Sequence, residues 1–108
     1  MNQLSRIIFV GFLALTLSAC SLFAQKTVWI DVRTVEEYQQ DHMDNTENIP
    51  HTEIATRIAD LGLDKDAPIK VFCRSGVRAG LALTSLQELG YTNVENVGGI
   101  ADARALQQ

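Results

Sequence analysis

The central segment of this chain is Ile69-Lys70-Val71-Phe72-Cys73-Arg74-Ser75-Gly76-Val77-Arg78. Its first four residues form an apolar run interrupted only by a lysine, which predicts a buried central strand. A segment with helical periodicity begins at Val77, so the thiol of Cys73 lies where a strand passes into a helix. A cysteine at such a junction, followed by two arginines and a glycine, predicts a nucleophile at the opening of an anion-binding loop.

The chemistry of this junction favours a reactive thiolate. The pKa of a cysteine falls at a helix N-terminus or beside an arginine, and the N–H groups of a first helical turn have no helical partners. Gly76 lets the backbone curl, and Arg74 and Arg78 are placed to bind a dianion. Taken alone, the six residues from Cys73 onward also fit a buried structural cysteine at a strand end, because cysteine is among the most buried residue types.

The rest of the chain alternates between strand and helix patterns. Residues 27–33, 69–72 and 91–97 are rich in β-branched, aromatic and other apolar side chains and predict strands, and residues 48–50 predict a short extended piece. We expect helices from a Thr34–Glu37 capping box to residue 41, from a cap at Thr52 to Gly62, from Val77 to Gly90 and over residues 101–106, with Gly98-Gly99 as a tight turn. This alternation predicts an α/β domain with a small, mainly parallel central sheet and helices on both of its faces.

Other residues are expected to serve the fold. Asp31 and Arg33 lie two residues apart at a strand end, where we expect a salt bridge that anchors the strand or holds a loop arginine. Leu81 and Leu89 make further faces of the helix after residue 77 apolar, which predicts a well-buried helix. We expect His42 to be structural, because a thiolate with a low pKa needs no general base.

The first residues have the pattern of a secretory signal peptide, which we place at residues 1–19. Leu17-Ser18-Ala19-Cys20 also resembles the lipobox of bacterial lipoproteins, in which the cysteine is lipidated. We therefore expect residues 20–26 to be a tether and residues 27–108 the folded domain, in the periplasm or cell envelope. Two alternatives stay open: a lipid anchor on Cys20 as the one membrane contact, or cleavage nearby that leaves a soluble protein.

Composition excludes several functional classes. The 108-residue chain has a formal net charge of −4 and no basic stripe, which argues against a nucleic-acid partner. After processing, Cys73 is the only free thiol, so neither a structural disulfide nor a zinc site with several cysteines is expected. His42 and His51 lack helical ligand spacing and a third partner, so we expect no metal site and no cofactor.

Two groups of motifs in the same chain resemble the rhodanese-homology domain family. The first group is Asp31-Val32-Arg33, Glu37-Tyr38, His42 and Asn48-Ile49-Pro50, and the second is Cys73-x-x-Gly76-x-Arg78, Leu86, Gly90-Tyr91, Val94 and Gly98-Gly99. The resemblance runs from Trp29 to about Gly99 and is strongest to the small single-domain periplasmic thiosulfate sulfurtransferases of the phage-shock type.

This resemblance implies a rhodanese-like fold and a catalytic Cys73. In the family cycle the thiolate takes the outer sulfur of thiosulfate, and the resulting persulfide passes that sulfur to cyanide or a thiol. The resemblance also implies that the loop binds the substrate and wraps the persulfide with its backbone N–H groups, with Arg74 and Arg78 as candidates for the sulfonate end. The loop residues are Arg74, Ser75, Gly76, Val77 and Arg78. We expect a monomer that binds a small anionic sulfur donor and transfers sulfur to a thiol or cyanide acceptor.

Three rival functions are weighed against this one. Cysteine phosphatases resemble the site but have one residue more between cysteine and arginine than the four present here. A non-enzymatic envelope sulfur carrier or stress-response binding module is suggested by Ala79, which replaces a hydroxyl residue frequent in the family. A redox thiol that forms mixed disulfides is weakened by the absence of a resolving cysteine. The sequence also departs from the family at Asn45-Thr46 and at Ala103.

Overall fold

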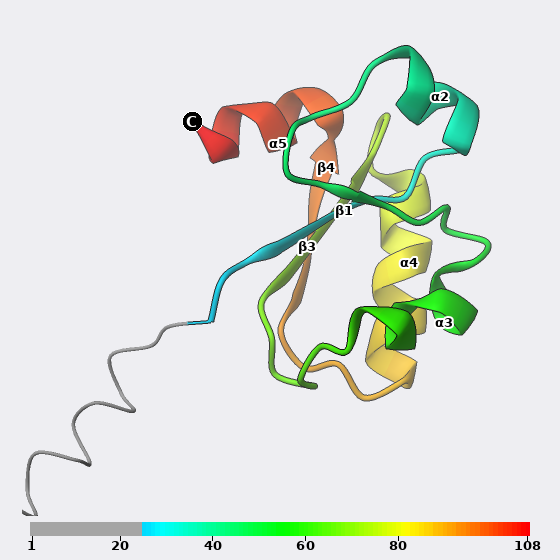
Figure 1. Ribbon diagram of the computed structural model, residues 1–108, viewed down its shortest axis with the longest axis vertical. Helices are drawn as coiled ribbons and strands as arrows, with labels where there is room; N and C mark the ends of the chain where they lie inside the picture. Colours follow the sequence, from blue (N-terminus) through cyan, green and yellow to red (C-terminus); the bar gives the residue numbers. More distant parts are fainter. Residues whose placement is uncertain (1–24) are drawn as a thin grey trace, which may run out of the picture.

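The structure is built on a sheet of four strands, all parallel, in the order β2-β1-β3-β4. The computed structural model describes residues 25–108 (Figure 1), so the expected signal peptide, Cys20 and most of the tether lie outside the described residues. The strands are β1 Val28–Asp31, β2 Glu47–Asn48, β3 Ile69–Cys73 and β4 Val94–Gly99. The predicted α/β class with a small parallel sheet is confirmed.

The apolar run before the cysteine forms the inner strand β3, which pairs with β1 on one side and β4 on the other. Ile69 and Val71 point into one layer of the core and are almost completely buried, and Phe72 is buried in the other layer. A strand covered on both faces needs apolar side chains at nearly every position, which is why this segment reads as a continuous run.

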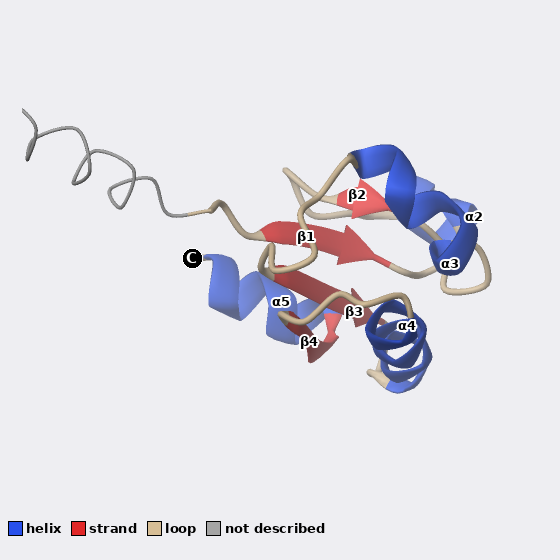
Figure 2. Cartoon of the chain, turned by 90° about the horizontal axis from the view of Figure 1, so that it is seen from below, coloured by secondary structure: helices blue, strands red, loops and turns tan. Residues whose placement is uncertain are grey.

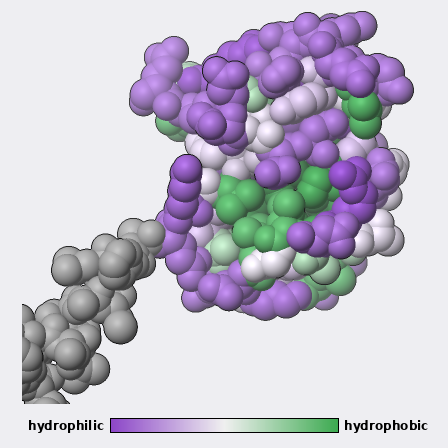
Figure 3. All heavy atoms as spheres, viewed as in Figure 1, coloured by the Kyte–Doolittle hydropathy of each residue, from purple (hydrophilic) through white to green (hydrophobic). Residues whose placement is uncertain are grey.

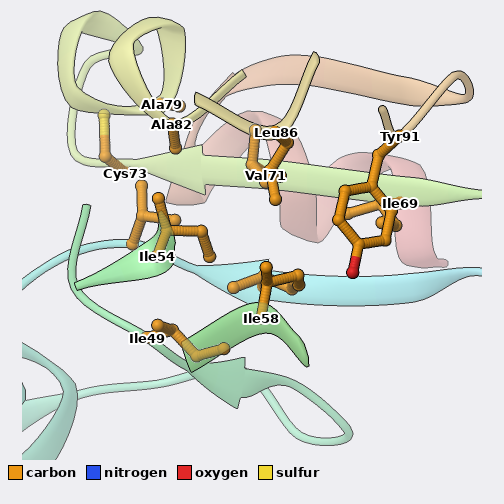
Figure 4. Packing of buried hydrophobic residues seen from close by; sticks show 12 residues of the cluster. Ile49, Ile54, Ile58, Ile69, Val71, Cys73, Ala79, Ala82, Leu86 and Tyr91 are labelled. Carbon is orange, nitrogen blue, oxygen red and sulfur yellow. The ribbon is translucent and has the colours of Figure 1, made fainter. Parts of the chain in front are cut away.

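Helices cover both faces of the sheet, as expected (Figure 2). On one face the sheet packs against α3 Ile54–Arg57, the 3₁₀ helix η2 Ile58–Leu61 and α4 Val77–Glu88. Figure 4 shows this layer, with Val71 of β3 facing Leu86 of α4 and Ile54 and Ile58 closing it from the side of α3. On the other face, α5 Ile100–Gln107 packs its Ala103 near Phe72 and Trp29.

The helix α2 Val35–Gln40 begins at the predicted capping box. The Glu37 N–H donates to Thr34 Oγ1 at 3.2 Å, and the Thr34 N–H donates to Glu37 Oε1 at 3.2 Å. Each of these bonds satisfies an N–H group at the helix start that has no partner within the helix. The box therefore sets where α2 begins, beyond the carboxyl end of β1 (Figure 1).

The expected salt bridge between Asp31 and Arg33 is present and buried. Arg33 Nε donates to Asp31 Oδ1 at 3.0 Å and Arg33 Nη2 donates to Asp31 Oδ2 at 2.7 Å. The same Nη2 donates to the Asp41 carbonyl oxygen at 2.7 Å, just after α2. The pair therefore fixes the end of β1 and the segment that follows α2. Of the two roles expected for it, it anchors the strand and does not bind an arginine of the cysteine loop.

The second helix differs from the prediction at its start. Its N-cap residue is Glu53 rather than Thr52, and no side chain caps it. After four residues the α-helix tightens into the 3₁₀ helix η2, which ends at Gly62 as expected. Ile54 and Ile58 are buried as their spacing indicates, so burial of the apolar face, rather than a cap, holds this segment in place.

The expectation that α4 is buried on several faces is wrong. Ala79, Ala82 and Leu86 are fully buried, but Leu81 is 56% exposed and Leu89 is 41% exposed. Only one stripe of the helix contacts the sheet and α3, because no element of residues 25–108 covers its outer side. The apolar residues on that side therefore face solvent.

Gly98-Gly99 is not the expected tight turn. Both glycines belong to β4, which begins at Val94 rather than at Tyr91. Tyr91 is buried, and its N–H donates to the Leu86 carbonyl oxygen, closing the end of α4. The strand therefore starts later and continues further, so that its last two residues lie beside the end of β3.

The surface of the described part is mainly hydrophilic. Figure 3 shows hydrophobic residues gathered between β1 and α4 in this view, framed by hydrophilic side chains. Val28, Leu61 and Leu63 are partly buried against the core that lies there. Among residues 25–108, no helix combines the length and the apolar character needed to cross a membrane.

Candidate active site

Cys73 is the last residue of β3 and sits beneath the loop that leads into α4. Its side chain is free of any disulfide, and the residue is only 1% exposed. Figure 4 shows its sulfur pointing toward the beginning of α4, near Ala79. The strand end and the helix start predicted from the sequence are therefore brought together around one sulfur atom.

The pKa of the Cys73 thiol is lowered, although burial alone raises it. The lowering comes from backbone N–H groups that face the sulfur, because they stabilise the thiolate. These belong to Ala79, Ser75, Gly76 and Arg78. The Gly76 N–H donates to Cys73 Sγ, with 3.0 Å between nitrogen and sulfur. The resemblance implies donors from the whole loop, residues 74–78. The donors found omit Arg74 and Val77 and include the backbone N–H of Ala79, which needs no hydroxyl side chain.

Gly76 has a backbone that favours glycine. Its φ of 102° places it in the left-handed region, and it is the N-cap residue of α4. A Cβ added there would also come within 3.3 Å of the Gly98 Cα. The left-handed conformation directs the Gly76 N–H at the sulfur and lets the helix begin at the next residue. Gly76 therefore both donates to the thiolate and caps α4.

The end of β4 packs directly against the backbone of the cysteine loop. Cys73 pairs with Gly99 after a register shift that begins at Val71. A Cβ added to Gly99 would lie 2.4 Å from the Arg74 carbonyl oxygen, a distance that no side chain tolerates. The loop backbone therefore rests directly on the backbone of Gly99, and Asp102 holds that residue by accepting its N–H at 2.9 Å.

The guanidinium of Arg78 is bound by Glu37. Arg78 Nη1 donates to Glu37 Oε1 at 2.6 Å and Nη2 donates to Oε2 at 3.0 Å. This hydrogen-bonded pair lowers the pKa of Glu37 to about 2, with the Thr34 cap adding to the effect against burial. The same bond raises the pKa of Arg78, to which the charge of Cys73 also contributes. Arg78 therefore brings positive charge to the loop while its own side chain is held by α2.

Arg74 is placed differently from Arg78. Its side chain is exposed, and it makes no ion pair with any residue of the described part of the chain. It lines a cleft of about 280 Å³ whose other lining residues are Arg33, Glu37, Gln40, Asp41 and Ile100. Of the two arginines expected to bind one dianion together, Arg74 is the one whose guanidinium is available.

Sequence reasoning located the cysteine loop but missed its supports. Glu37 was assigned only to the capping box, although it also binds Arg78. Gly99 was placed in a turn, and no role was given to Asn96, which contacts both the loop and Gly98. The adjacent glycines were the one available signal, because paired glycines in a strand indicate close approach of another backbone.

The side-chain contacts of His42 are with Tyr38 of α2. His42 stacks on the Tyr38 ring at a centroid distance of 4.2 Å, and its Nδ1 lies 3.0 Å from the Tyr38 carbonyl oxygen. This arrangement gives His42 a local structural contact. Within residues 25–108, no group of three or more His, Cys, Asp or Glu side chains is arranged to hold a metal ion.

The two glycines Gly99 and Gly80 give opposite predictions for the same substitution. Gly99→Ala should lower the free energy of unfolding by about 1–3 kcal/mol and displace the loop, because the new methyl group overlaps the Arg74 carbonyl. Gly80→Ala should raise it by about 0.5–1 kcal/mol, since the position is helical and its nearest neighbour, Asn96 Nδ2, would be 3.6 Å away. Denaturant unfolding measures both, and a stabilised Gly99→Ala variant would contradict the proposed close approach.

The Glu37–Arg78 pair predicts a pH-dependent contribution to stability. Because the pKa of Glu37 is lowered to about 2 on folding, its ionised form stabilises the protein above its unfolded pKa. Glu37→Gln keeps the capping bond but removes the charge, so it should cost up to about 1 kcal/mol at pH 7.

That difference should shrink as the pH falls from about 4.5 toward 2, where the wild-type pair is also lost. Unfolding curves across this range measure it. Glu36→Gln, in the same turn and without an ion pair in the described structure, is the matched control. An equal and pH-independent loss in both variants would exclude the ion pair as the cause.

Comparison with known proteins agrees with this geometry. Residues 20–105 match the Rhodanese-like domain family. The chain is 46% identical over 93 residues to the thiosulfate sulfurtransferase PspE of Escherichia coli (strain K12), covering 85% of this chain and 88% of that protein. A solved structure of a rhodanese with anions from E. coli superposes with a TM-score of 0.68 at 47% identity, covering 71% of this chain and 91% of that one.

A more distant similarity is to the putative sulfur carrier protein YrkF of Bacillus subtilis (strain 168). It is 32% identical over 68 residues, which cover 63% of this chain and 36% of that protein. The matched region and the solved structure agree with the motifs around Cys73 and with the parallel sheet that carries it. The predicted resemblance is confirmed, and the chain belongs to the family of rhodanese-like domains.

Proposed function

We propose that this protein is a thiosulfate sulfurtransferase that works through a persulfide on Cys73. The observation that carries the proposal is a buried thiol whose pKa is lowered by backbone N–H groups that converge on its sulfur. The similarity to a thiosulfate sulfurtransferase over most of both chains supports the same activity. Sulfur transfer needs a nucleophilic thiolate and hydrogen-bond donors that stabilise an extra sulfur anion, and the backbone N–H groups of this loop favour both.

In the first half-reaction, the Cys73 thiolate attacks the outer sulfur of thiosulfate. A new bond forms between the two sulfur atoms, the S–S bond of thiosulfate breaks, and its electron pair leaves with sulfite. Charge balances, because a thiolate and a dianion become a persulfide anion and sulfite dianion. No proton is transferred and no oxidant is required, so this step needs no general base.

In the second half-reaction, an acceptor takes the terminal sulfur. Cyanide attacks it to give thiocyanate, or a thiolate attacks it to give a new persulfide, and in both cases the electron pair of the broken bond returns to Cys73. Until then the negative charge is on the terminal sulfur, where the N–H groups of the loop replace the solvation lost on burial. The Gly76 N–H, at 3.0 Å from Sγ, is one of these donors.

Arg74 is the side chain proposed to bind the sulfonate end of the donor. It is exposed at the loop and lines the cleft beside α2, so it attracts a small dianion without first having to break an ion pair. The positive charge of Arg78 reduces the repulsion between that dianion and the thiolate, although its guanidinium stays bound to Glu37. Ser75 and Gly76 contribute backbone N–H groups, whereas Val77 is not among the residues whose N–H groups face the sulfur.

A sulfur carrier without turnover is the second candidate. It is favoured by Ala79 at a position where the family often has a hydroxyl group, and by the similarity to a putative sulfur carrier. Such a protein would load sulfur on Cys73 in the same way but would release it only to a specific partner.

Intact mass measured after addition of thiosulfate tests the shared first step. The wild-type protein should gain one sulfur atom and Cys73→Ser should gain none. An adduct that persists in Cys73→Ser, or no adduct on the wild type, would exclude a Cys73 persulfide. Thiocyanate formation with excess cyanide then separates the candidates. Continuous turnover identifies the enzyme, and sulfur loading on Cys73 without continuous thiocyanate formation identifies the carrier.

For localisation we propose the periplasm or cell envelope, with a lipid on Cys20. The proposal rests on the order of a basic residue, an apolar run and Leu17-Ser18-Ala19-Cys20 in the sequence. Labelling of bacteria that express the full chain with a fatty-acid analogue should mark the wild type and leave Cys20→Ala unmarked. Equal labelling of both would contradict the anchor, and an unlabelled wild type in the periplasmic fraction would support simple cleavage.

A further inference from the structure

Asn96 of β4 connects the cysteine loop to the glycine pair beneath it. Its Nδ2 donates to the Gly76 carbonyl oxygen at 2.9 Å, and its Oδ1 accepts the Gly98 N–H at 2.9 Å. The two partners fix how the amide is turned, because a carbonyl oxygen only accepts and an N–H only donates. Asn96 is partly buried and lies 20 residues after Gly76, so the contact exists only in the folded sheet.

The N–H and the carbonyl of Gly76 belong to two different peptide groups, which face in opposite directions at this site. The Gly76 N–H points at the Cys73 sulfur, so the following carbonyl must point away from it to avoid placing a negative oxygen against a thiolate. That outward carbonyl is the group that Asn96 binds, together with the Gly80 N–H of α4 at 3.0 Å. A left-handed glycine has wide conformational freedom, and here a side chain outside the loop restricts it.

We propose that Asn96 is a positioning residue for the sulfur-transfer reaction. It touches neither the sulfur nor the cleft; it holds the Gly76 carbonyl outward and thereby keeps the Gly76 N–H directed at the thiolate. The inference rests on the proposed role of Cys73 as the nucleophile. The N-cap residue of α4 makes no side-chain hydrogen bond, so no side chain of the loop itself holds the Gly76 carbonyl, and Asn96 takes this role.

Loss of this contact should raise the pKa of the Cys73 thiol. A hydrogen bond of this kind is strong enough to orient a peptide group. We expect its loss to raise the thiol pKa by about half a unit to one unit. At a pH below the thiol pKa, alkylation by iodoacetamide should then be about three to ten times slower in Asn96→Ala. At a pH well above the pKa, where the thiol is fully ionised, wild type and variant should react at similar rates.

The matched control is Asn93→Ala. Asn93 lies just before β4 at the opposite end of the sheet, where its Nδ2 donates to the Asp66 carbonyl oxygen at 3.4 Å. This variant loses one exposed amide hydrogen bond far from the loop, so the thiol pKa should stay at the wild-type value. A pKa shift in Asn96→Ala no larger than that in Asn93→Ala would overturn the proposal.

Asn96→Asp provides a second test should the alanine variant not fold. It keeps the acceptor for the Gly98 N–H but places an oxygen against the Gly76 carbonyl, so the carbonyl is repelled instead of held. Measured at high salt, which screens the added charge, the thiol pKa should still rise, and an unchanged pKa would overturn the proposal. Alkylation needs no sulfur donor, so a failure of persulfide formation leaves this test intact and is recognised separately.

Discussion

A thiolate that is removed from water is stable only where hydrogen-bond donors replace the solvent that it has lost. Cys73 is almost completely buried, and its pKa is nevertheless lowered because backbone N–H groups surround its sulfur. Backbone donors are suited to this task, since they carry no flexible side chain that must be ordered when the charge forms. The path of the loop, the left-handed Gly76 and the start of α4 all follow from the need to aim these groups at one atom.

The same requirement explains why segments far apart in the chain meet at the loop. From one side, Glu37 of α2 binds Arg78 across a separation of 41 residues. From below, Gly99 lets the loop approach so closely that a methyl group would collide with the Arg74 carbonyl. The Glu37–Arg78 ion pair and the backbone of Gly99 thus restrain a short loop that has few apolar contacts of its own.

Local patterns were enough to predict the strand before Cys73, the capping box of α2 and the α/β class with helices on both faces. Each of these depends on residues that are neighbours in the sequence. The contacts of Glu37, Asn96 and Gly99 depend instead on how β1, β3 and β4 are aligned, including the register shift near Cys73. Exposure of Leu81 likewise follows from the absence of a covering element, within residues 25–108, on the outer side of α4. The sequence names such residues, but only the assembled sheet shows what they touch.

The register of Cys73 against Gly99 has a consequence for when the protein acquires its chemistry. In an unfolded chain the N–H groups of residues 75–79 bind water, and the cysteine has the ordinary pKa of about 8.5 for a free thiol. In the folded chain four of them face the sulfur, and β4 pairs beside β3 so that Gly99 lies against the loop. The lowered pKa of the thiol is therefore a property of the folded chain, and an unfolded chain carries a comparatively inert cysteine.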